Sequence, residues 1–280
     1  MDLPVNLPPL DIPKLLRQAG LQPDKRLGQN FLLDEAVLDH IVEAAQVTDT
    51  DFVLEIGAGL GSLTRHLACV AREVIAVEVD KRLIPLLKEV LASLNNVRIL
   101  QGDILSLYVT PLLPESGYLV VANIPYYITS AIIRHLIELP VPPKSFVLTI
   151  QREVAERICA EPGEMSLLAI SVQVYGFPHI VTHVPASAFY PTPEVDSSVV
   201  RVDLFPEPLI APAMTDVFFR LVKAGFSQKR KTLRNALAGG LGMPPGQVEP
   251  MLRNAGIDPM RRAETLSIAE WERVVRAYQA

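Results

Sequence analysis

Between residues 51 and 151 the chain alternates short apolar runs with amphipathic stretches, and this alternation restricts the possible folds more than any other feature. The apolar runs are rich in Val, Ile and Leu and are bounded by turn or charged residues, as buried parallel strands are. The expected strands are residues 51–57, 73–79, 96–100, 118–124 and 145–151, and the expected helices between them are residues 62–71, 81–94 and 129–139. Such alternation predicts an open, doubly wound α/β sheet.

The pattern changes in the last third of the sheet region and again after Pro206. Three apolar runs, residues 166–176, 179–185 and 197–205, follow without helices between them, which favours an antiparallel edge on the sheet. Beyond Pro206 only helical periodicity remains, with helices expected at residues 213–226, 229–238, 246–255 and 267–278. We therefore expect three parts: an N-terminal extension (1–24), a sheet domain (25–205) and a small all-α C-terminal domain (206–280).

The average charge of the chain conceals an uneven distribution. A net charge of −5 argues at face value against a nucleic-acid partner. However, residues 206–280 hold 11 Lys and Arg against 7 Asp and Glu, whereas residues 1–205 hold 15 against 24. A basic C-terminal part attached to an acidic body keeps nucleic acid open as a partner.

Composition narrows the class of protein further. The chain has no apolar stretch long enough to cross a bilayer, and its Pro-rich start lacks the order of a signal peptide. Cys69 and Cys159, far apart in sequence, are expected to be reduced thiols of a cytoplasmic protein. The histidines show no metal-binding pattern, so we expect no metal site.

A glycine-rich turn follows the first expected strand. Gly57, Gly59 and Gly61 are spaced as G-x-G-x-G and precede a helix, so the backbone can turn sharply and approach a ligand closely. Glu78 ends the next strand, where a carboxylate can accept both hydrogens of a ribose diol. Asp103 ends the third strand and could accept from an adenine amino group. Polar groups at one edge of three successive strands predict a nucleoside ligand.

The fourth strand ends in Asn123, Ile124, Pro125 and Tyr126. An amide oxygen and a backbone carbonyl can accept the two hydrogens of an adenine N6, which frees its lone pair for attack on a methyl group. Proline has no N–H and leaves nearby carbonyls free as acceptors. Tyr126 is placed to stack on the base.

A compact basic stretch lies in the C-terminal part. Its cations are Lys223, Lys229, Arg230, Lys231 and Arg234, and we expect it at the start of a helix. Such a run is often only a solvated face, but beside a nucleoside site it favours binding to RNA phosphates. Lys25 and Arg26, near the N-terminus, could extend this surface.

Taken together, these motifs resemble those of the rRNA adenine N6-dimethyltransferases. The resemblance covers about residues 25–280 and includes three further segments, residues 29–32 (QNFL), 189–197 (FYPTPEVDS) and 262–267 (RAETLS). With the basic stretch, the last segment matches the branch that acts on bacterial small-subunit rRNA. The usual Lys and Tyr-Gly after Pro162 and Gly163 are missing, and the resemblance is silent on the first 20 or so residues.

The resemblance implies a Rossmann-like class I methyltransferase sheet and a mechanism by direct methyl transfer. It implies S-adenosylmethionine as methyl donor, held by Asn30, Leu32, Gly57, Gly59, Glu78, Asp103 and Asn123. It also implies that Phe189 holds the target adenine from the face opposite Tyr126. The implied partner is 16S rRNA within the small ribosomal subunit or its precursor, without a membrane, and we expect a monomer.

Two other functions stay open from sequence. One is a large-subunit rRNA adenine methyltransferase of the antibiotic-resistance type, which shares the cofactor motifs and the segment from Asn123 to Tyr126. The other is a non-catalytic RNA-binding assembly or transcription factor.

Overall fold

In the computed structural model, residues 7–114 and 117–280 are described, and they form two compact units. The first unit runs up to Ala155 and continues from His179 to Leu204; the second comprises Glu156–Pro178 and Phe205–Ala280. The division into domains at residues 24 and 205 stays a prediction, and residues 1–6 of the expected extension lie outside the described residues. The segment Glu156–Pro178 belongs to the second unit because Ala169 and Ile170 are buried in the same core as Phe218 and Trp271.

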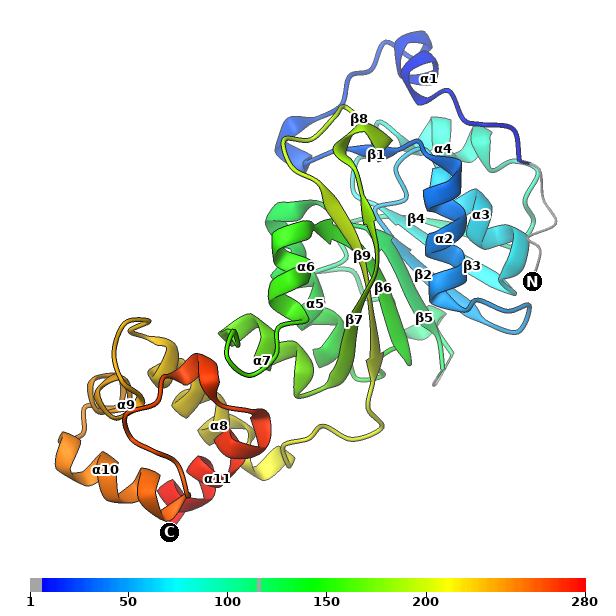
Figure 1. Ribbon diagram of the computed structural model, residues 1–280. Coiled ribbons are helices and arrows are strands. Elements are labelled where there is room, and N and C mark those ends of the chain that lie inside the picture. Colours follow the sequence, from blue (N-terminus) through cyan, green and yellow to red (C-terminus); the bar gives the residue numbers. More distant parts are fainter. Residues whose placement is uncertain (1–6, 115–116) are drawn as a thin grey trace. The chain divides into compact units, whose positions relative to one another are not determined.

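Seven strands form one mixed sheet within the described part of the chain, in the order β4-β3-β2-β5-β6-β9-β7 (Figure 1). The strands are β2 (Phe52–Ile56), β3 (Glu73–Glu78), β4 (Val97–Gln101), β5 (Leu119–Asn123), β6 (Ser145–Gln151), β7 (Gly176–Val184) and β9 (Ser197–Leu204). The neighbours from β4 to β6 pair in parallel, whereas β9 pairs antiparallel with β6. The predicted α/β sheet with an antiparallel edge is confirmed.

Helices cover both faces of this sheet. On one face, α2 (Glu35–Ala45) and α3 (Ser62–Val70) share a buried cluster with alternate residues of the strands, including Val53 and Val121. On the same face, α4 (Ile84–Val90) packs Leu87 against Ala76 of β3, whereas α5 (Thr129–Glu138) lies on the side of the sheet opposite α2 (Figure 1). Side chains alternate between the two faces along each strand, and helices cover both faces. The strands are therefore buried on both sides, which explains why these runs are apolar throughout.

The N-terminal segment adds elements that periodicity did not predict. Helix α1 (Ile12–Gln18) is capped by Asp11, whose carboxylate accepts the Lys14 N–H at 3.0 Å. Two short strands, β1 (Phe31–Leu32) and β8 (Phe189–Tyr190), pair antiparallel in a separate small sheet. Ile12 and Leu16 of α1 are buried with Phe31, so the helix packs on β1.

The second unit is helical. Its helices are α7 (Leu167–Gln173), α8 (Pro212–Phe226), α9 (Leu233–Leu241), α10 (Pro245–Asn254) and α11 (Ile268–Gln279), and α6 (Arg152–Ile158) spans the junction of the two units. The C-terminal helices are confirmed, but the expected strand at residues 166–176 is wrong because residues 167–173 are helical. Ser166 caps that helix by accepting the Ala169 N–H at 3.1 Å.

Candidate active site

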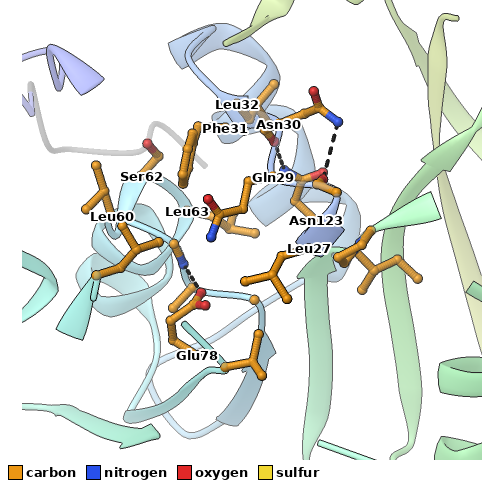
Figure 2. Close-up of a pocket in the computed structure, with 18 of the residues that line it drawn as sticks. Leu27, Gln29, Asn30, Phe31, Leu32, Leu60, Ser62, Leu63, Glu78 and Asn123 are labelled. Carbon is orange, nitrogen blue, oxygen red and sulfur yellow. Dashed lines mark hydrogen bonds between the residues drawn. The ribbon is translucent and has the colours of Figure 1, made fainter. Parts of the chain in front are cut away.

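A cavity opens at the carboxyl edge of the parallel strands, where ligands bind in open α/β sheets. Its wall comes from four segments, residues 27–32, 55–63, 78–83 and 123–126. Figure 2 shows Glu78 and Asn123 at this cavity, from strands β3 and β5 on either side of β2. Nine of the expected site residues line it: Asn30, Leu32, Gly57, Gly59, Glu78, Asn123, Ile124, Pro125 and Tyr126.

The glycine-rich turn between β2 and α3 forms the floor of this cavity. Gly57, Gly59 and Gly61 all have positive φ angles, of 78°, 59° and 89°, which side chains rarely adopt. A Cβ on Gly59 would lie 3.1 Å from the Phe31 ring, and one on Gly57 would lie 3.4 Å from the Asn123 carbonyl oxygen. The turn therefore needs glycine both for its conformation and for the space beside the cavity.

Glu78 is the polar group that fixes this turn. Its side chain is only 4% exposed, and its two oxygens accept the backbone N–H groups of Gly59 and Asp80, each at 2.7 Å. Burial raises the pKa of the Glu78 carboxyl, although the two backbone donors act in the opposite direction. The carboxylate is thus held in one orientation at the cavity wall, ready to accept from ligand hydroxyls.

Asp103 has a less direct position than the sequence predicted. It follows β4, is exposed, and its Oδ1 accepts the Leu105 N–H at 3.0 Å. It is not among the residues that line the cavity. The preceding Gly102 does lie beside the site, since its N–H donates to the Glu78 carbonyl at 2.9 Å.

The turn after β5 presents Asn123 and Tyr126. Asn123 Nδ2 donates to the Asn30 carbonyl at 3.0 Å, which leaves Oδ1 as the acceptor of this amide (Figure 2). The Tyr126 hydroxyl lies 2.7 Å from Ser197 Oγ, and Ser197 is fully buried. Both side chains are therefore held by partners outside the turn, so that one face of the Tyr126 ring and the Asn123 amide can act on the same ligand.

Phe189 differs from the expectation. It pairs with Leu32 across the small sheet, is 3% exposed, and does not line the cavity. Its neighbour Tyr190 is half-buried and lines an adjoining groove instead. The stacking role of Phe189 stays a prediction.

Glu55 is a site residue that the sequence interpretation did not assign. It belongs to β2, lines the cavity and is 1% exposed, and its Oε2 has no hydrogen-bond partner among the described residues. Burial raises the pKa of Glu55 to about 8, and the nearby Glu78 carboxylate adds to the effect. Near neutral pH this side chain is therefore mainly a neutral acid. An acidic residue inside an otherwise apolar strand was the available signal.

The segment with Gln29 is fixed by a polar network at the rim. Gln29 Nε2 donates to Asp80 at 2.9 Å, and Gln29 Oε1 accepts the Asp24 N–H at 2.7 Å. Hydrogen bonding from Arg82 lowers the pKa of Asp80 to about 2. Gln29 thus links the N-terminal segment at Asp24 to Asp80, which follows β3, so both ends of its amide are already hydrogen-bonded within the protein.

The basic stretch lies in the second unit, in a position different from the one expected. Residues 227–232 connect α8 to α9, so Lys229, Arg230 and Lys231 precede the helix that was expected to contain them. These three residues and Lys223 of α8 are exposed, whereas Arg234 is paired with Glu249 at 2.9 Å. Four exposed cations can therefore meet phosphates directly, and Arg234 would first have to leave its carboxylate.

The described residues contain no cluster of three or more His, Cys, Asp or Glu side chains placed to hold a metal ion. None of their helices combines the length and the apolar character needed to span a membrane.

Comparison with known proteins places the chain among rRNA-modifying enzymes. The family model of ribosomal RNA adenine dimethylase matches residues 20–280. The chain is 45% identical over 275 residues to ribosomal RNA small subunit methyltransferase A of Dehalococcoides mccartyi, covering 95% of this chain and 94% of that relative. It is 43% identical to the protein of the same name from Moorella thermoacetica, with coverages of 95% and 96%.

Solved structures show the same relationship. A dimethyladenosine transferase from Plasmodium falciparum is similar with a TM-score of 0.77 and 27% identity, covering 89% of this chain and 97% of that one. The 23S rRNA methyltransferase ErmE is similar with a TM-score of 0.73 and 29% identity, covering 90% and 100%.

Proposed function

The chain belongs to the ribosomal RNA adenine dimethylase family, and from this premise we propose that it dimethylates N6 of two adjacent adenines in a hairpin near the 3′ end of 16S rRNA. The modification would accompany assembly of the small ribosomal subunit. The observation that carries the proposal is one cavity that joins a glycine turn and Glu78 to Asn123 and Tyr126. Similarity to small-subunit methyltransferases over nearly the full length supports the choice of substrate.

The cavity residues fit S-adenosylmethionine. A Cβ on Gly59 would crowd the Phe31 ring at 3.1 Å, and Glu78 keeps a carboxylate fixed where a ribose diol could donate to it. We assign cofactor binding to Asn30, Leu32, Gly57, Gly59, Glu78 and Asn123, with Asp103 at the adenine end. When bound, the cofactor supplies an electrophilic methyl on its sulfonium, and S-adenosylhomocysteine is the product. No metal enters the proposal.

Asn123 would position the target nitrogen. Because its Nδ2 is held by the Asn30 carbonyl, its Oδ1 faces the incoming N6–H as an acceptor. Pro125 cannot donate, and its own carbonyl accepts from Ile128, so the Ile124 carbonyl is the nearby acceptor for the second hydrogen. With both hydrogens accepted, the N6 lone pair points away from the ring plane. As N6 gains the methyl it becomes acidic, and its proton passes to water.

Tyr126 would recover part of the cost of removing the adenine from its stack. Its ring is fixed by the hydrogen bond to Ser197, so it loses little freedom when a base stacks on it. Phe189 would act on the opposite face of the base. The contribution of the protein is therefore alignment and exclusion of water rather than covalent catalysis.

The cations of the second unit would bind rRNA phosphates. Lys223, Lys229, Arg230 and Lys231 are exposed, and Arg234 lies beside them in sequence. Backbone contacts of this type recognise the shape of an RNA helix rather than its bases. We expect the protein to act as a monomer in the cytoplasm, on the small subunit or its precursor.

The similarity to a 23S rRNA methyltransferase keeps a large-subunit substrate as the second candidate. Incubation with labelled S-adenosylmethionine and either undermethylated small subunits or large-subunit rRNA distinguishes the two. We expect labelled N6,N6-dimethyladenosine in the small subunit alone. Label in the large-subunit RNA would support the second candidate, and absence of label from both would favour a non-catalytic RNA-binding protein.

A further inference from the structure

A groove adjoins the cofactor cavity within the first unit. It has a volume of about 860 Å³, in the range of ligand-binding clefts, and shares Gly28, Gln29, Asn30 and Tyr126 with the cavity. One wall is α1 with the turn that follows it, and the facing wall is the segment from Tyr190 to Val195. Because Tyr126 lines both the cavity and the groove, an RNA strand that stacks a base on Tyr126 would continue into the groove.

The wall formed by α1 is a fixed part of the fold. Ile12 and Leu16 are 0% and 2% exposed and belong to the cluster of Phe31 and Leu83. The segment before the helix is held as well, because Arg65 Nη2 donates to the Pro8 carbonyl at 2.8 Å. The helix therefore shapes the groove in the folded protein and is not merely an appended terminus.

The chemistry of the groove differs from that of the unit around it. Arg17 and Lys25 are exposed at the wall formed by α1, and the described residues place no ion pair on either; Glu194 is the one acid among the residues that line the groove. Two cations against one acid contrast with an acidic first unit. Tyr190 and Tyr126 add two partly exposed aromatic rings. Cations beside aromatic faces are the groups that bind single-stranded nucleic acid.

We propose that this groove is a subsite for the nucleotide next to the target adenine. Tyr190 stacks on the neighbouring base, and Arg17 and Lys25 bind the phosphates on either side of it. The N-terminal segment is then part of the substrate site. The inference rests on the proposed function, in which two adjacent adenines are substrates, so that one of them occupies the groove while the other is methylated.

The test compares the dinucleotide ApA with AMP as ligands of the full chain. S-adenosylhomocysteine is present in excess so that neither ligand enters the cofactor cavity. The wild-type protein should bind ApA more tightly than AMP, by about 5- to 150-fold for one stacked base. Tyr190→Ala should abolish most of this advantage and leave AMP affinity unchanged, whereas Tyr190→Phe, which keeps the ring, should preserve it.

The cations have a separate readout and a matched control. Arg17→Gln/Lys25→Gln should lower the log–log salt slope of binding to undermethylated small subunits by about 0.7 for each lost phosphate contact. Lys14→Gln/Lys81→Gln, which removes two exposed cations that do not line the groove, should leave it unchanged. Circular dichroism confirms that each variant is folded.

Equal affinity of the wild-type protein for ApA and AMP would overturn the inference. It would also be overturned if folded Tyr190→Ala kept the tighter binding of ApA and folded Arg17→Gln/Lys25→Gln kept the wild-type salt slope. Methylation of small subunits by the wild-type protein is measured in parallel. If methylation is normal and the groove variants behave as wild type, the subsite alone is refuted. If the wild-type protein methylates neither adenine, the proposed function fails and the subsite with it.

Discussion

Replacement of Glu55 by Gln tests whether a neutral acid lies at the wall of the proposed cofactor cavity. Glutamine has nearly the same shape but cannot ionise, so the variant isolates the charge of one buried carboxyl. In the unfolded chain the ordinary pKa of this group is 4.5, whereas burial raises the pKa of Glu55 in the folded protein to about 8. The folded state therefore retains a proton that the unfolded state has lost at intermediate pH.

The sign and size of the effect follow from proton linkage. Below pH 4.5 both states are protonated, and Glu55 makes no difference to stability. As pH rises from 4.5 to about 8, the unfolded chain binds fewer protons than the folded one, so the free energy of unfolding falls. Each pKa unit is worth about 1.4 kcal/mol. Over the full difference between the unfolded-state pKa of 4.5 and the folded-state pKa of about 8, the free energy of unfolding therefore falls by roughly 5 kcal/mol.

Glu55→Gln should therefore match the wild-type protein near pH 5 and be more stable by several kcal/mol at pH 8. Urea unfolding at pH 5, 6.5 and 8 measures this difference. Trp271, the one tryptophan of the chain, is fully buried in the second unit, so its fluorescence follows that unit alone. Glu55 belongs to the first unit. The gain in stability at pH 8 should therefore appear in the unfolding transition of that unit, followed by circular dichroism, and not in the transition followed by tryptophan fluorescence.

Glu43→Gln serves as the matched control, because it makes the same substitution on an exposed position of α2. It should not alter the pH dependence of unfolding. If Glu55→Gln and the wild-type protein differ by the same amount at pH 5 and pH 8, the Glu55 carboxyl ionises normally, and its description as a neutral acid is wrong.

Three further predictions concern the site and the RNA surface. Glu78→Gln should weaken S-adenosylmethionine binding by about 1.5–3 kcal/mol in calorimetric titration, because a charged acceptor is lost; unchanged affinity in the folded variant would refute its role. Asn123→Ala should lower the single-turnover methylation rate about 100-fold or more at saturating cofactor and RNA, while RNA affinity, which depends mainly on phosphates, should change little. Tyr126→Phe keeps the stacking face and should retain much of the activity, and a wild-type rate for Asn123→Ala would make the turn only structural. Replacing Lys229, Arg230 and Lys231 by Ala should reduce the salt slope of rRNA binding by about 0.7–0.9 per lost phosphate contact, whereas Arg276→Ala, which removes a cation paired with Glu272 at 2.6 Å, should not.

The strands and the main residues that line the cavity were predictable because they depend on local signals and on parallel register. Apolar runs between turn residues located β2 to β6, and the pairing of Ile56 with both Val77 and Ala122 brings the ends of these strands together. Glu78 and Asn123, each the last residue of its strand, then necessarily lie at one edge.

Helix α7 was not predictable from periodicity because the run at residues 166–176 is mostly apolar, and from Ile170 to Val174 it alternates apolar with polar residues. Such a run fits a buried strand as well as a buried helix. The surrounding core of the second unit decides the outcome, since Ala169 and Ile170 pack with residues more than 40 positions away in sequence, such as Phe218.

The positions of Phe189 and Tyr190 could not be predicted for a different reason. Side chains alternate between the two faces of a strand, and β8 contains only these two residues. A two-residue strand offers no periodicity to show which aromatic side chain faces the core. In the structure Phe189 is buried and Tyr190 faces the groove, an assignment that depends on their pairing with Leu32 and Phe31.

The formal charge of the chain overstates the negative charge at the proposed cofactor site. Asp80 is paired with Arg82 at 2.6 Å, Asp24 with Arg26 at 3.2 Å, and Glu55 holds its proton up to about pH 8. Glu78 differs from these three acids. Its carboxylate has no cationic partner in the described part of the chain and is held instead by the backbone N–H groups of Gly59 and Asp80. Pairing and burial therefore neutralise Asp80, Asp24 and Glu55, and Glu78 stays as a carboxylate that could accept from the ribose diol of the proposed cofactor.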